Sequence, residues 1–195
     1  MCSSDLSWRP SKPWALPAPS WPHSSSGKPG FSPRSNSLDE LDPIVDRLSE
    51  HRIGVEFRHR GWVEGEQAER TFGYLSEHGA SFVAVDSPRE EHMTLMPPVD
   101  AVTDERLAYM RAHGRNAKGY MTGKTVAERF GWSYTDDELE DIKRRALALA
   151  EDALDVRVMF NNNRGADAPT SARRMRQMLG QDPGPPPEEP QLKLA

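Results

Sequence analysis

Short apolar runs alternate with amphipathic stretches along the middle of the chain. The apolar runs predict β-strands at 53–57, 81–85, 107–112 and 156–160. The amphipathic stretches repeat apolar residues at helical spacing and predict helices at 37–50, 66–78, 135–152 and 168–179. Strands that alternate with helices in this way form βαβ units, so we predict an α/β fold with a parallel sheet.

Several helix ends carry their own sequence signals. Thr135 stands just ahead of Glu138 in the pattern of a capping box, which marks a helix start. Gly79 follows the second predicted helix, and glycine tolerates the left-handed backbone that commonly ends a helix. Asp167 is expected to cap the last predicted helix.

Polar side chains gather at the carboxyl ends of the predicted strands. Side chains alternate between the two faces of a strand, so the face of each one can be counted along the sequence. Asn163 is expected to share a face with Asn161, while Asn162 points toward the helices. The polar side chains that we predict on one shared face are Glu56, Arg58, Asp86, Arg111, His113 and Asn161.

One polar sheet face distinguishes between two α/β architectures. A doubly wound sheet buries apolar side chains on both faces, and the sequence has no Gly-x-Gly-x-x-Gly after a predicted strand. A TIM barrel collects polar side chains at the carboxyl ends of its strands. The pattern therefore favours a barrel mouth.

Four motifs occur in order along this region. They are the segments 55–62 (VEFRHRGW), 83–88 (VAVDSP), 110–116 (MRAHGRN) and 159–163 (MFNNN). Together they resemble the YecE-like family, also called domain of unknown function number 72, and the resemblance covers roughly residues 31–180. It implies a TIM-barrel fold without an established activity.

The number of strands departs from a whole barrel. A TIM barrel has eight strands in about 250 residues, whereas the sequence predicts four. We therefore expect about four C-terminal βα units of a (β/α)8 barrel, as a fragment of a longer gene. The alternative is a homodimer that closes one barrel from two copies, because half a barrel leaves two sheet edges open.

Proline and serine crowd both ends of the chain. Proline removes a backbone donor and fixes φ, so residues 1–33 and 181–195 are predicted to be disordered, around a folded part at 34–180. Residues 2–6 (CSSDL) also match what a common sequencing adapter encodes, which gives the hypothesis that the leader is not native.

Charge and composition narrow the function further. The chain has a formal net charge of −5, and this acidity argues against a general nucleic-acid binder. Its mean hydropathy of −0.75 is low for a compact globule. The apolar runs are too short to cross a membrane, so no membrane partner is expected. The single Cys2 excludes an internal disulfide and a multi-cysteine metal site. With no apolar export signal, a cytoplasmic location is expected.

Three of the predicted face residues are candidates for catalysis. Glu56, Asp86 and His113 combine two carboxylates with an imidazole, which can transfer protons. The same groups could hold a divalent metal, so the cofactor is left open and no metal ligand is assigned. In the structural alternative, the carboxylates form buried salt bridges with Arg58 and Arg111.

Further polar residues are candidates for binding a small anionic or polyhydroxylated substrate. They are Arg58, Arg111, Arg115, Lys124, Asn161 and Asn163. Residues 114–134 are predicted to form a long, mobile loop that carries cations and aromatic rings over the site. Lys118 stands where a Walker A motif needs glycine, so no P-loop is assigned. We predict an enzyme, as a hydrolase, isomerase or lyase; the alternative is a phosphate- or nucleic-acid-binding module without catalysis.

Overall fold

A four-stranded parallel sheet forms the centre of the computed structural model, which describes residues 30–90, 93–162 and 164–184. The strands lie side by side in chain order, and each pairs in parallel with the next. They are β1 (Ile53–Val55), β2 (Ala80–Asp86), β3 (Ala108–Ala112) and β4 (Val156–Phe160). The predicted α/β fold with a parallel sheet is confirmed.

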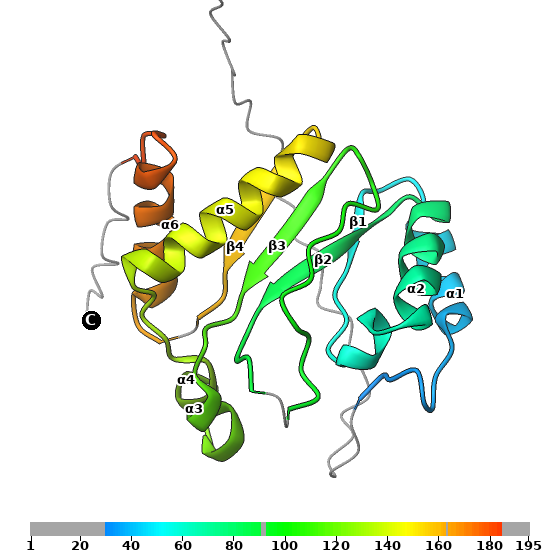
Figure 1. Cartoon of the computed structure of the whole chain (residues 1–195), viewed down its shortest axis with the longest axis horizontal. Helices are drawn as coiled ribbons and strands as arrows, with labels where there is room; N and C mark the ends of the chain where they lie inside the picture. The colour runs from blue at the N-terminus through cyan, green and yellow to red at the C-terminus, as the bar shows by residue number, and fades with distance from the viewer. Residues whose placement is uncertain (1–29, 91–92, 163, 185–195) are drawn as a thin grey trace, which may run out of the picture.

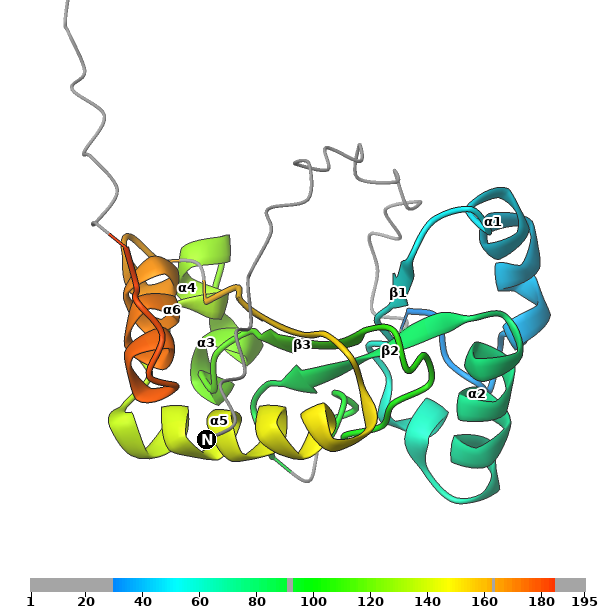
Figure 2. The same ribbon diagram turned by 90° about the horizontal axis from the view of Figure 1, so that it is seen from above.

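Helices pack beside the sheet and beyond the carboxyl ends of its strands. Figures 1 and 2 show α2 and α5 along one face, α6 beside β4, and α3 and α4 beyond the strand ends. The 3-10 helices are η1 (Leu38–Leu41) and η2 (Arg60–Val63). The α-helices are α1 (Asp42–Arg47), α2 (Glu66–Glu77), α3 (Ala117–Thr122), α4 (Val126–Phe130), α5 (Asp136–Asp152) and α6 (Asp167–Met178).

Most predicted helix ends are confirmed. The Thr135 hydroxyl accepts from the Glu138 backbone, and the Glu138 carboxylate accepts from the Thr135 backbone, so the capping box at α5 is complete. Gly79 has a φ of +59°, the left-handed backbone expected after α2. Asp167 is the first residue of α6 and makes no capping bond, so the cap predicted there is wrong. Its carboxylate instead accepts from Ser133 and Arg164.

The predicted loop at 114–134 contains two short helices instead. Asn116 caps α3 by accepting from the Gly119 backbone, and Thr125 caps α4 by accepting from the Glu128 backbone. The side-chain amide of Asn116 also donates to the carbonyls of Glu128 and Gly131, both at 3.1 Å. These contacts join residues far apart in the loop, which is why local sequence patterns did not reveal the pair of helices.

The main core lies between the sheet and the helices. Every residue of β2 is buried, and Met110 of β3 is fully buried. From α5, Ile142 and Leu149 join the same apolar cluster, as does Leu75 of α2. The burial of these side chains holds the helices on one face of the sheet.

An aromatic group extends the core toward the start of the described chain. Phe31 stacks on Trp62 with ring centroids 4.9 Å apart, and the Trp62 indole donates to the Phe31 carbonyl at 3.0 Å. Phe57 lies 5.3 Å from Trp62 and 6.4 Å from Phe31, so the three rings form one group. The folded part therefore begins before residue 34, while residues 1–29 and 185–195 of the predicted tails lie outside the described residues.

The pairing register assigns the faces of the sheet. Val85 pairs with Arg111, and Arg111 with Met159, so these three share a face. Asp86 pairs with Ala112 and lies on the opposite face, against α5. The prediction that Asp86 shares a face with Arg111 is therefore wrong. Because β2 is apolar on both faces, the polarity of its neighbours did not show which way Asp86 points.

The face that carries Arg111 points away from α2 and α5 (Figure 2). Met159 on this face is 47% exposed, and Tyr109 is half-buried.

In the described part of the chain, no helix combines the length and the apolar character needed to cross a membrane.

Candidate functional site

Glu56 is the centre of a polar cluster at the end of β1. Its Oε2 accepts from Nη1 of Arg111 at 2.7 Å, and its Oε1 lies 2.8 Å from Nε of Arg58. The same Oε1 lies 3.1 Å from Nε2 of His113. Only 11% of the Glu56 side chain is exposed. The structure thus brings together three residues that the sequence placed on one face with Glu56.

The charge state of Glu56 follows from these partners. Burial raises the pKa of the carboxyl, but the hydrogen bond from His113 and the positive charges of Arg58 and Arg111 outweigh it. Together they lower the pKa of Glu56 from 4.5 to about 2. The side chain is therefore a carboxylate at neutral pH. It accepts hydrogen bonds there and has no proton to donate.

His113 is held on both ring nitrogens. Its Nε2 faces the Glu56 carboxylate, which only accepts, so Nε2 carries the hydrogen. The Asn161 amide donates to Nδ1 at 3.2 Å, so Nδ1 is the unprotonated nitrogen. The ring is only 2% exposed. Two partners thus fix both the orientation and the tautomer of the imidazole.

Asp86 anchors a separate ion network on the other face of the sheet. Its side chain is fully buried and accepts from Arg115 at 2.8 Å and from Arg89 at 3.1 Å. The Tyr134 hydroxyl donates to it at 2.8 Å, and Arg145 of α5 lies at 3.4 Å. The network joins the end of β2, the residues after β3, and α5.

Further carboxylates belong to this network. Asp141 accepts from Arg89 at 2.6 Å and from Arg115 at 2.8 Å, and Asp100 pairs with Arg145 at 2.8 Å. Burial raises the pKa of Asp141, but the hydrogen bonds and charges of Arg89 and Arg115 lower it to about 2. Arg115 is therefore occupied by carboxylates of the protein.

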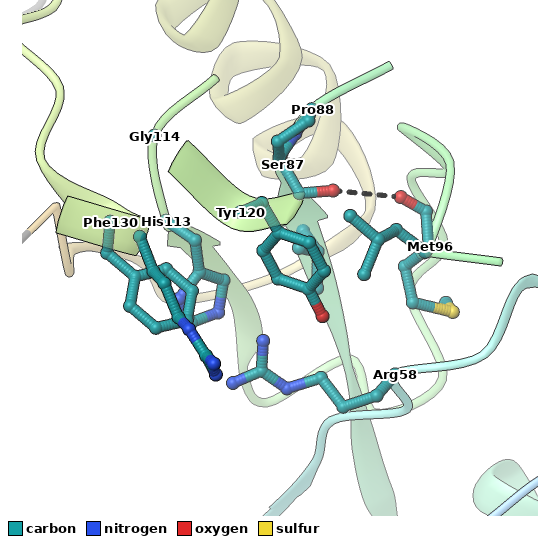
Figure 3. Close-up of a pocket in the computed structure, with 11 residues that line it drawn as sticks. Arg58, Ser87, Pro88, Met96, His113, Gly114, Tyr120 and Phe130 are labelled. Carbon is teal, nitrogen blue, oxygen red and sulfur yellow. Dashed lines mark hydrogen bonds between the residues drawn. The ribbon is translucent and has the colours of Figure 1, made fainter. Parts of the chain in front are cut away.

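A small pocket opens beside the Glu56 cluster (Figure 3). Arg58 and His113 line it from the strand side, and Tyr120 and Phe130 line it from α3 and α4. In Figure 3 the Arg58 side chain extends toward the Tyr120 ring, with His113 and Phe130 beside them. The remaining lining residues are Val85, Ser87, Pro88, Leu95, Met96, Gly114 and Arg129.

The other predicted binding residues lie elsewhere. Lys124 is exposed in the turn between α3 and α4. Asn162 is buried and donates to the Trp132 carbonyl and to Ser171 of α6, which confirms its predicted helix-side orientation. Asn163 lies outside the described residues. Within those residues, no group of three or more His, Cys, Asp or Glu side chains is arranged to hold a metal ion.

Comparison with known proteins identifies the family. Residues 28–193 match the family described as "Protein of unknown function DUF72". The chain belongs to the DUF72 family. This confirms the relation to domain of unknown function number 72 that the four motifs predicted.

Proteins similar to this DUF72 chain are longer. UPF0759 protein YunF of Bacillus subtilis (strain 168) is 34% identical over 155 residues, which cover 77% of this chain and 55% of that protein. The crystal structure of a DUF72 family protein (EF0366) from Enterococcus faecalis V583 has a TM-score of 0.69 and 27% identity, covering 78% of this chain and 58% of that one. For a DUF72 family protein (TM1631) from Thermotoga maritima MSB8, the TM-score is 0.63 and the identity 28%, with 75% and 54% covered. The chain thus spans little more than half the length of these relatives.

Some residues of the DUF72 site were missed by sequence reasoning. Phe130 and Met96 reach the pocket from segments without a local signature. Arg145 had a readable signal, because it falls on the apolar face of α5 between Ile142 and Leu149. A buried arginine at such a position needs a carboxylate partner, and Asp86 and Asp100 are those partners.

Proposed function

We propose that this DUF72 protein is an enzyme that uses His113 for proton transfer on a small anionic substrate. The observation that carries the proposal is the chain of contacts from Glu56 through His113 to Asn161. A carboxylate that holds one imidazole nitrogen orients the ring and stabilises the positive charge that forms when the other nitrogen takes a proton. Glu56 therefore has the role of orienting group.

Nδ1 of His113 is the atom that takes the proton. In the free protein this nitrogen accepts from the Asn161 amide. A substrate that displaces the amide gains access to a nitrogen whose lone pair is already directed away from Glu56. Asn161 then becomes a donor to the substrate. This arrangement suits isomerisation, elimination or hydrolysis, all of which need one proton transferred at a defined position.

Arg58 supplies the positive charge for the substrate. Its side chain is 54% exposed, whereas that of Arg111 is 27% exposed and bonded to Glu56. Arg58 and His113 line the same pocket, so an anion held by Arg58 lies beside the imidazole. Asp86 has a positioning role on the opposite face of the sheet, where it accepts hydrogen bonds from Arg115 and Tyr134 near the strand ends.

Turnover of a panel of phosphorylated compounds and sugar acids, followed by NMR, tests the proposal. His113→Gln is expected to abolish turnover, and Glu56→Gln is expected to lower it by roughly a hundredfold or more, since acid–base groups typically contribute about that much. Lys124→Gln is the control, because this exposed cation lies in the turn between α3 and α4 and does not line the pocket. Undiminished turnover in His113→Gln would reject the role of His113.

We also propose that the sheet is part of a TIM-barrel-like (β/α)8 fold. Consecutive parallel strands with a polar cluster at their carboxyl ends support it, because barrel enzymes bind ligands there. With four strands in the described part of one copy, a homodimer is an arrangement that would complete a barrel. Light scattering on the purified protein tests it, and a monomer at all concentrations would reject the dimer. The cytoplasmic location stays a prediction from the sequence.

A further inference from the structure

The helices α3 and α4 cover the imidazole of His113. Its ring centroid lies 6.3 Å from that of Phe130 in α4, and the Phe130 ring meets Tyr120 of α3 edge to face with centroids 6.0 Å apart. Figure 3 shows these rings beside the end of the Arg58 side chain. The cavity between them is about 10 Å³, the space of about one water molecule. A larger molecule therefore cannot reach the imidazole through this pocket while α3 and α4 keep this position.

Neither helix is held in place by a buried side chain. All residues of α3 and α4 are at least partly exposed, whereas α5 buries five of its side chains. Tyr120 and Phe130 are half-buried, and the apolar Met121 and Val126 are 61% and 56% exposed. Most of the stability of a helix in a protein comes from burial of its apolar face. The attachment of α3 and α4 to the sheet is therefore weak compared with that of α5.

The hydrogen bonds of this segment tie it to itself. The Asn116 side chain joins the two helices, since it accepts from the backbone of α3 and donates to the carbonyls of Glu128 and Gly131. Among the described residues, 116–131 hydrogen-bond only to one another, apart from one backbone bond to the carbonyl of Arg115. The two helices thus form one unit.

Both ends of this unit are anchored in the folded protein. On one side, Arg115 pairs with Asp86 and with Asp141, each at 2.8 Å. On the other side, the carbonyl of Trp132 accepts from the buried amide of Asn162 at 2.6 Å. A weakly attached unit between two fixed ends has the construction of the lids that close over enzyme sites.

We infer that residues 116–131 are a lid that opens as one unit and gives access to His113. In the closed position, Tyr120 and Phe130 exclude molecules larger than water from the imidazole. Opening breaks no ion pair, because none joins the lid to the rest of the described protein. The inference rests on the proposed function for the role of His113, and it adds how a substrate reaches that side chain.

Hydrogen exchange of backbone amides tests the lid on the wild-type full chain. The amides of α3 and α4 are expected to share one opening and to exchange roughly a hundredfold or more faster than those of α5, because a local opening costs less than global unfolding. Their rates are also expected to change little at low urea, since a local opening exposes little surface. Protection as strong as in α5 would overturn the inference, and so would unrelated rates in the two helices.

Modification of His113 by diethyl pyrocarbonate, followed by peptide mass spectrometry, links this opening to the imidazole. The reagent is larger than the closed cavity, so it reports an open lid. His113 is expected to react in the native protein with the same weak dependence on urea as the amides of α3 and α4. The exposed His51 is the internal control, because no opening limits its reaction. Reaction of His113 only in parallel with global unfolding would show that the lid does not open.

Single substitutions distinguish the cover over His113 from a general loosening of the fold. Phe130→Ala removes the ring beside the imidazole and is expected to speed the modification of His113 by roughly tenfold or more. Met121→Ala is the matched control, because this exposed side chain lies on the same lid and does not line the pocket. Equal acceleration in both variants would contradict the cover. The amide exchange of the wild type tests the lid even if Phe130→Ala fails to fold.

Two outcomes separate the lid from the proposed function. If the lid amides and His113 share one opening while His113→Gln turns over substrate normally, the lid holds and the proposed proton transfer fails. If His113→Gln abolishes turnover while the amides of α3 and α4 are as protected as those of α5, the proposed function holds and the lid fails.

Discussion

Protonation of Glu56 is expected to remove the stabilisation that Arg58, Arg111 and His113 give to its carboxylate. These partners lower the pKa of Glu56 from 4.5 to about 2 against the opposing effect of burial. At roughly 1.4 kcal/mol for each pKa unit, the difference corresponds to about 3 kcal/mol of folding free energy. Because the pKa is lower in the folded protein, this free energy is fully present above about pH 4.5 and is lost as the pH falls toward 2.

Urea denaturation of the wild type and Glu56→Gln at several pH values measures this loss. Between about pH 7 and pH 2.5, the free energy of unfolding of the wild type is expected to fall by about 3 kcal/mol more than that of the variant. Other carboxylates, Asp141 included, titrate in both proteins and cancel in the difference. Glu140→Gln is the control, because this carboxylate is exposed and paired only with Lys143 among the described residues. Parallel pH curves for the wild type and Glu56→Gln would refute the reasoning.

Three further predictions concern the ion network around Asp86, the segment that follows β3, and the imidazole of His113. Asp86→Asn removes the buried negative charge that faces Arg145. It is expected to lower the free energy of unfolding by about 3 kcal/mol in urea titrations at neutral pH, and a loss below about 1 kcal/mol would contradict this. Gly114→Ala is expected to cost roughly 1–3 kcal/mol of stability in urea titrations, because φ is +89° and the new Cβ would lie 2.6 Å from Cβ of Trp132; an unchanged free energy of unfolding would contradict this. Nitrogen NMR of His113 is expected to show the hydrogen on Nε2 at neutral pH, and a hydrogen on Nδ1 would exclude the proposed base.

Local rules predicted the parts of this fold that depend on neighbouring residues. The capping box at Thr135 and Glu138 involves only residues one helical turn apart, so its sequence pattern was sufficient. The contact between Glu56 and His113 was also accessible, because strand alternation placed both on one face. The capping box needs no knowledge of the tertiary structure, whereas the contact between Glu56 and His113 joins two strands and followed from the prediction that their polar faces point the same way.

Other features that depend on distant partners could not be predicted. The orientation of Asp86 depends on the register between β2 and β3, and an apolar strand buried on both faces contains no signal for it. The placement of Arg129 and Phe130 depends on the contacts of Asn116 with carbonyls at Glu128 and Gly131. These long-range hydrogen bonds form only when the chain has folded, so the pocket could not be assembled from sequence.

The sheet also limits which insertions and deletions the chain can tolerate. Val85 and Asp86 are adjacent in β2, yet they belong to opposite faces and to two different environments. Removing or adding one residue inside β2 would exchange them, burying Val85 among the arginines of α5 and the following segment and turning Asp86 toward the pocket. The segment between β2 and β3 has no such constraint, because its length does not set the strand faces. The length of β2 is therefore as strictly required as its composition.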